Sequence, residues 1–261
     1  MEFVGYLALI GIGIVLSLIG GGGSLLSVPI LVYLFSLDIV TASSYSLFIV
    51  GTTSLLGALL KHKEQRADLR AGIIFSMSSV VAVFSTRKWI IPSIPEEILF
   101  ANDLVVTKRA LILGVFAMLV IASSLMILLK HSWASNDDGK RRLKFLLPVS
   151  FTTGIIGGFV GAGGGFLILP SLVIFGRLPF KIAVGTTLLV IGFNSLLGFL
   201  GDVMNYSINW LFLVMITGLA SVGMFLGNIV SAKIPVYYLR LSFGWIMMIT
   251  AIMILVKEWI L

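Results

Sequence analysis

Gly20-Gly21-Gly22-Gly23-Ser24 interrupts a run of apolar sequence that carries no charged residue from position 3 to position 37. A second cluster, Gly161-Ala162-Gly163-Gly164-Gly165, lies in another charge-free run, and prolines follow the two clusters at matching distances, Pro29 and Pro170. Glycine and proline both weaken a helix. In hydrocarbon such a break is tolerated only where it packs against protein or lines a wet cavity. Two matched breaks therefore predict a site that is built by two half-proteins.

The composition defines the class of protein. The chain has 261 residues, of which 59% are hydrophobic and 11% are charged, whereas soluble domains carry about 25% charged residues. We therefore expect an all-α polytopic membrane protein. The absence of cysteine excludes disulfides and thiolate metal sites. The net charge of +7 is typical of basic cytoplasmic loops in a membrane protein, which we favour over nucleic-acid binding.

The two halves of the chain repeat one another at a constant spacing, which we call the repeat offset. It aligns Gly20 with Gly161 and Pro29 with Pro170, and at the same offset the segment 54–57 is identical to the segment 195–198. Apolar composition alone does not place glycines and prolines in register. We expect a first membrane repeat over 1–130, a basic cytoplasmic connector over 131–144 and a second membrane repeat over 145–261, with about 7–9 membrane segments in total.

Equivalent loops of the two repeats differ in charge. The loops 61–70 and 130–144 are basic and should be cytoplasmic. The loop equivalent to 61–70 follows Gly201 and has only Asp202, and it should lie outside. Equivalent loops therefore face opposite sides, which predicts two inverted repeats, a recurrent plan of secondary transporters. Arg87 and Lys88 near an external end are the exception to this charge pattern.

With inversion, each glycine run must enter and leave the membrane on the same side, as a hairpin or a broken helix. Each turn would then start a short half-helix at Ser24 or Gly165, with Ser24 as a cap. Free N–H groups and the helix dipole make such a terminus an anion site. We expect the two termini to point at one shared site near the midplane. The alternative is that the glycines only allow close helix packing.

The helices that follow the glycine runs contribute polar side chains to the same predicted site. Thr53 and Asn194 occupy equivalent positions near the middle of their spans, where an unpaired amide is costly. Interhelical hydrogen bonding is an equal alternative for them. The predicted substrate-binding residues are Gly20, Gly22, Gly23, Ser24, Thr53, Gly161, Gly163, Gly164, Gly165, Thr186, Thr187 and Asn194.

The glycine clusters with their prolines, followed by Phe180-Lys181-Ile182-Ala183-Val184-Gly185-Thr186-Thr187, resemble the sulfite exporter TauE/SafE family of membrane permeases. The resemblance covers nearly the whole chain and implies export of a small sulfur-containing anion, sulfite or an organosulfonate, across the inner membrane. The first half departs from the pattern, because it has Ser44-Tyr45 where the second half has Gly185-Thr186.

Other functions stay open at this stage. The chain has no set of nucleophile, base and acid, no metal-ligand cluster and no carboxylate pair within a span, so we expect no enzyme, no metal and no cofactor. A passive anion channel or a non-transporting integral membrane subunit remains as an alternative. The expected partners are a small anionic substrate and the lipid bilayer, and a homodimer is left open.

Overall fold

The protein is a bundle of helices. The computed structural model describes residues 2–20, 22–64, 66–95, 97–100, 104–129, 146–160, 164–231 and 234–259. The first half contains α1 (Glu2–Ile19), α2 (Gly22–Leu34), α3 (Ile39–Lys63), α4 (Leu69–Ser85), the π-helix η1 (Thr86–Ile90), α5 (Ile91–Ser93) and α6 (Lys108–Leu129). The second contains α7 (Leu146–Val160), α8 (Gly165–Ile174), α9 (Phe180–Val203), α10 (Trp210–Ser231) and α11 (Val236–Trp259). The expected connector lies outside the described residues.

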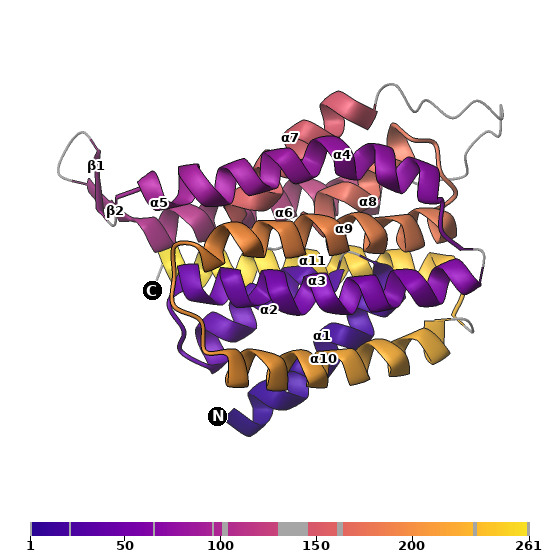
Figure 1. Ribbon diagram of the computed structural model, residues 1–261, viewed down its shortest axis with the longest axis horizontal. Coiled ribbons are helices and arrows are strands. Elements are labelled where there is room, and N and C mark those ends of the chain that lie inside the picture. The colour runs from indigo at the N-terminus through magenta and orange to yellow at the C-terminus, as the bar shows by residue number, and fades with distance from the viewer. Residues whose placement is uncertain are drawn as a thin grey trace.

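A small antiparallel hairpin is the one addition to the expected all-α plan within the residues that the structure describes. It consists of β1 (Glu97–Phe100) and β2 (Leu104–Thr107), with Glu97 opposite Thr107, and it precedes α6. It projects beyond the helices at one end of the bundle (Figure 1).

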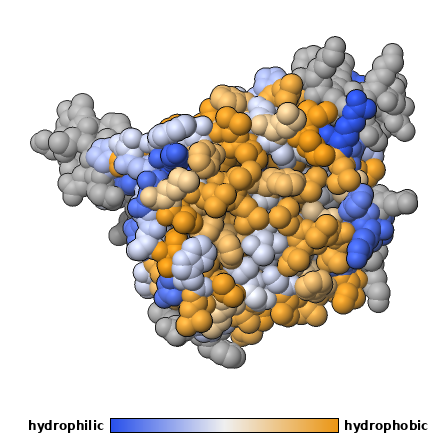
Figure 2. Space-filling view, viewed as in Figure 1, coloured by the Kyte–Doolittle hydropathy of each residue, from blue (hydrophilic) through white to orange (hydrophobic). Residues whose placement is uncertain are grey.

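The helices are apolar enough for a multi-pass membrane protein. Among the described residues, five helices have the length and hydropathy to cross a membrane, and three further apolar helices are shorter. On the face seen in Figure 2, apolar side chains cover the middle, and the most hydrophilic ones gather toward its two sides. This banding matches a hydrocarbon slab bounded by water on both sides.

The internal repeat predicted from the sequence is present in the backbone. The repeat offset that aligns Gly20 with Gly161 also takes the first residue of α3 to the first residue of α9, and the first residue of α4 to that of α10. Ser36 and Arg177 are equivalent at the same offset, and both have a left-handed backbone, with φ of 53° and 52°. Such a φ is uncommon for residues other than glycine, so its recurrence at equivalent positions supports a true structural duplication.

The packing of the two repeats is also matched. α1 packs against α10, and the equivalent helices α7 and α4 pack against each other. Gly13 of α1 lies against the carbonyl of Ala220, while its equivalent Gly154 lies against the carbonyl of Ser79. At these two positions glycine serves close helix packing.

The repeats are inverted with respect to each other. Gly51 of α3 contacts Leu196 of α9, and Leu55 of α3 contacts Gly192 of α9, so the two helices run antiparallel. Since α3 and α9 are equivalent elements, the two repeats have opposite directions. Figure 1 shows the consequence, with the α3–α4 connection at one end of the bundle and the equivalent α9–α10 connection at the other. We call these ends the Lys61 end and the Arg87 end.

Both glycine runs form hairpins, as predicted. Gly5, near the start of α1, packs against the ring of Phe35 just after α2, so the chain folds back on itself. In the second repeat Gly176, after α8, lies near Leu146 at the start of α7. The first hairpin enters from the Arg87 end and the second from the Lys61 end.

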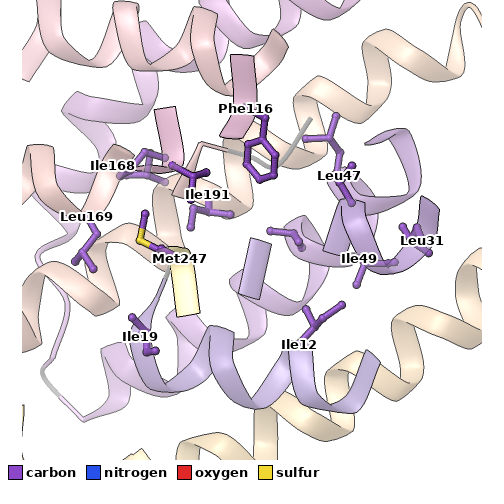
Figure 3. Packing of buried hydrophobic residues seen from close by; sticks show 14 of the residues in the cluster. Ile12, Ile19, Leu31, Leu47, Ile49, Phe116, Ile168, Leu169, Ile191 and Met247 are labelled. Atoms are coloured by element: carbon purple, nitrogen blue, oxygen red, sulfur yellow. The ribbon is translucent and has the colours of Figure 1, made fainter. Parts of the chain in front are cut away.

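The core is shared between the repeats. Figure 3 shows Ile12, Leu31 and Ile49 of the first half in one packed region with Ile168, Ile191 and Met247 of the second half. These side chains are fully buried or nearly so. The two halves therefore form one unit, because neither covers its apolar faces without the other.

Candidate functional site

The first glycine turn lies close to the Lys61 end. Gly20 has a φ of 78°, a conformation that favours glycine. A Cβ added at Gly20 would lie 2.9 Å from the backbone carbonyl oxygen of Val184, so the close approach also requires glycine. Val184 is near the start of α9, so the turn reaches almost through the bundle.

The helix after this turn begins earlier than expected. α2 starts at Gly22, so Gly22, Gly23 and Ser24 all belong to its first turn. Ser24 is therefore inside the helix and is not the residue that caps it, which corrects our expectation. The first N–H groups of α2 still have no acceptor within their own helix, as at any helix start.

The second turn is near the Arg87 end. Gly164 has a φ of 69° and is the cap residue of α8, which begins at Gly165 as predicted. Gly158, in the last turns of α7, packs against Val83 and Thr86. Gly161 and Gly163 lie outside the described residues, so their predicted part in the site has no structural description.

The two turns do not meet at the midplane. The first lies beside Val184, and the second lies at the level of Thr86, next to Arg87, which pairs with Asp202. Val184 and Asp202 lie near opposite ends of α9 and are about 27 Å apart at the rise of an α-helix. The expectation of one shared anion site at two helix termini is wrong for this conformation.

Thr53 and Asn194 lie where α3 crosses α9. The hydroxyl of Thr53 donates to the carbonyl of Ile49 in its own helix, at 2.6 Å. The amide oxygen of Asn194, which is 1% exposed, accepts a hydrogen bond of 2.8 Å from Ser79. Within the described residues the amide nitrogen of Asn194 has no partner. Interhelical hydrogen bonding thus explains the amide oxygen of Asn194 but not its amide nitrogen.

The neighbouring threonines of α9 differ. Thr186 donates to the carbonyl of Ile182 and accepts from the N–H of Asp68, at 2.8 and 2.9 Å, so its hydroxyl fastens the α3–α4 connection. The hydroxyl of Thr187 is buried and, among the described residues, has no hydrogen-bond partner. Thr187 is the better placed of the two to accept a ligand hydrogen bond or to donate one.

A buried ion pair at the Arg87 end was missed by the sequence analysis. The guanidinium of Arg87 lies 3.1 Å from the carboxylate of Asp202, and the two side chains are 1% and 0% exposed. Ser43 accepts from Arg87 at 2.9 Å, and Ser44 donates to Asp202 at 2.6 Å. Arg87 Nε and Asp202 Oδ1 have no partner among the described residues. The pairing explains why a basic residue lies near the end expected to be external.

No group of three His, Asp or Glu side chains that would hold a metal ion occurs within the part of the chain that the structure describes. The features that are present are an inverted repeat, two glycine hairpins inserted from opposite ends and buried polar groups along α3 and α9. Together they define an integral membrane protein of the transporter class.

The comparison with protein families gives the same result. The model of the sulfite exporter TauE/SafE family matches residues 6–254, and the chain belongs to this family. It is 25% identical to a probable membrane transporter protein of Xylella fastidiosa strain Temecula1, over 95% of this chain and 92% of that protein. It is 26% identical to the probable membrane transporter protein YunE of Bacillus subtilis, over 89% and 90% of the two chains. No solved structure matches the chain.

Proposed function

We propose that the protein is a secondary permease that exports a small anion, sulfite or an organosulfonate, across the inner membrane of the cell. The observation that carries the proposal is the pair of equivalent hairpins, α1–α2 and α7–α8, inserted from opposite ends between antiparallel repeats. In such an arrangement the two halves can exchange conformations, so that one site is exposed to each side in turn. The name of the family supplies the substrate class.

The buried charges favour an anion over a cation. Among the described residues the buried charged side chains are Lys61, Arg87, Lys108 and Asp202. Arg87 pairs with Asp202 and Lys108 has an interaction partner, so Lys61 is the buried cation for which no ion pair occurs among the described residues. A buried charge is costly unless it is compensated. A buried cation without an ion-pair partner, such as Lys61, repels a permeating cation and attracts an anion.

Transport of labelled sulfite in proteoliposomes tests the proposal. We expect uptake to accelerate when the vesicles are preloaded with unlabelled sulfite, because a carrier exchanges its substrate across the membrane. A passive channel gives no such counterflow, and a non-transporting subunit gives no uptake above empty vesicles. Labelled phosphate and a labelled monovalent cation serve as controls. Movement of the cation without any anion would contradict the proposal.

A further inference from the structure

A pocket at the Lys61 end carries three cations. Its lining combines side chains of α1, α3, α9, α10 and α11 with the α3–α4 connection, and it consists of Leu18, Lys61, Arg66, Phe180, Lys181, Val184, Ser231 and Leu239. The charged members come from two different repeats. Glu64 is the carboxylate next to the pocket, and it pairs with Arg66 at 3.1 Å. The balance of these four charges is positive.

Lys61 is the deepest of these cations. It is 3% exposed, and its ammonium lies 2.5 Å from the hydroxyl of Ser231. That hydroxyl donates to the carbonyl of Asn228, so it accepts from Lys61. An ammonium has three protons to donate, and no carboxylate of the described residues forms an ion pair with Lys61. The position of Lys61 in the last turn of α3 is favourable to the helix dipole, but this offsets only part of the cost of burial.

The first glycine turn lies against the same pocket. Gly20 contacts Val184, which lines the pocket, and Leu18, just before the turn in the chain, lines it as well. The start of α2 follows immediately at Gly22. An anion in the pocket would therefore sit beside a contact between the two repeats, which the transport proposal has exchanging conformations.

We propose that this pocket is a binding site for a small oxyanion, with Lys61 as its buried counter-ion and with Arg66 and Lys181 attracting the anion at the mouth. The inference rests on the proposed function, since the anion would be the substrate at the Lys61 end. Lys61 has no carboxylate within ion-pair distance among the described residues, and a sulfite or sulfate ion would supply that contact through charge-assisted hydrogen bonds.

The same chemistry is offered by the phosphate of an anionic lipid. The test therefore measures binding of sulfite and sulfate to purified protein in neutral detergent, with and without added phosphatidylglycerol. We expect both oxyanions to bind without lipid. Lys61→Met should weaken their binding at least about tenfold, because a charge-assisted contact is lost from a buried site. Lys61→Arg should retain part of the affinity.

Lys63→Met is the matched control. Lys63 is exposed, lies in the same last turn of α3 and is absent from the lining, and its replacement changes the net charge of the protein equally. We expect its binding to stay within about twofold of the wild type, since exposed charges are screened. Lys181→Gln, at an exposed lining residue, should weaken binding by an intermediate factor and keeps the test decisive if Lys61→Met does not fold.

Three results would overturn the inference. They are wild-type affinity in well-folded Lys61→Met, an equal loss in Lys63→Met, and binding of phosphatidylglycerol that sulfite does not displace. Sulfite transport by a protein whose pocket binds no anion would refute the inference and leave the proposed function standing. Anion binding that depends on Lys61, in a protein that transports nothing, would support the inference and refute the proposed function.

Discussion

The Lys61 end and the Arg87 end are built from equivalent positions but differ in charge. At the repeat offset, Asp202 is the equivalent of Lys61, and Asn228 is the equivalent of Arg87. At the Arg87 end, Arg87 and Asp202 form a buried ion pair. At the Lys61 end the equivalent positions hold a lysine and an asparagine, and the lysine hydrogen-bonds to Ser231.

The symmetry of the backbone does not extend to the electrostatics of the two ends. At the Arg87 end, the buried Arg87 pairs with Asp202, a carboxylate of the second repeat. At the Lys61 end, the buried Lys61 lies beside a pocket. Under the transport proposal, an incoming anion meets an uncompensated charge at one end and competes with Asp202 for Arg87 at the other. The divergence of a few side chains thus gives the two ends of a nearly symmetric scaffold different charges.

The largest expected contrast between the ends concerns their accessibility from the two sides of the membrane. Lys63 and Met204 are equivalent exposed residues at the Lys61 end and the Arg87 end. Because the chain has no native cysteine, Lys63→Cys and Met204→Cys can be labelled singly with a membrane-impermeant maleimide. We expect Met204→Cys to react on intact cells and Lys63→Cys only after permeabilisation. Labelling of both from one side would refute the inverted orientation.

The next largest effect should be on stability. Asp202→Ala leaves Arg87 buried without its counter-ion, and breaking such a pair costs about 3–5 kcal/mol. Lys61→Ala, at the equivalent position, removes a buried charge that has no ion-pair partner among the described residues, and it should cost much less. The melting temperatures of the purified variants measure this difference.

The double variant Arg87→Met/Asp202→Leu is the control for this prediction. Replacing both members of a buried pair by apolar residues is often neutral or stabilising, so it should recover most of the loss caused by Asp202→Ala. If Asp202→Ala and Lys61→Ala lower the melting temperature equally, the two ends do not differ as the comparison states.

The sequence predicted the fold to the extent that local patterns determine it. The repeat offset predicted the duplication, and the glycine clusters predicted the hairpins at Gly20 and Gly164. The depth of the turns was predicted wrongly, since we expected both to point at one shared site near the midplane. α1 has 18 residues, or about 27 Å of helix, which is nearly the thickness of a hydrocarbon core of about 30 Å. The turn is therefore carried past the midplane.

The candidate site was less accessible to sequence analysis, because its contacts join residues of different repeats. Arg87 stood out only as a charge on the unexpected side, and its partner Asp202 is far away in the chain. Lys61 was placed in a loop, whereas it lies in the last turn of α3 and is buried by α10. The alignment of the two repeats did contain one usable signal, since it pairs Lys61 with Asp202.

The smallest effects are expected at the crossing of α3 and α9, between the two ends. Thr53→Val should change stability little, because its hydroxyl bonds only within its own helix.

Asn194→Leu should cost about 0.6–2 kcal/mol, since it removes the interhelical bond to Ser79. The amide nitrogen of Asn194 has no partner among the described residues, so under the transport proposal it is available to donate a hydrogen bond to the anion. We therefore expect Asn194→Leu to reduce sulfite counterflow by more than its loss of folded protein explains. Ser79→Ala, which removes the same interhelical bond and keeps the amide, separates the two effects. If Ser79→Ala and Asn194→Leu lower counterflow equally, Asn194 acts only in packing the helices.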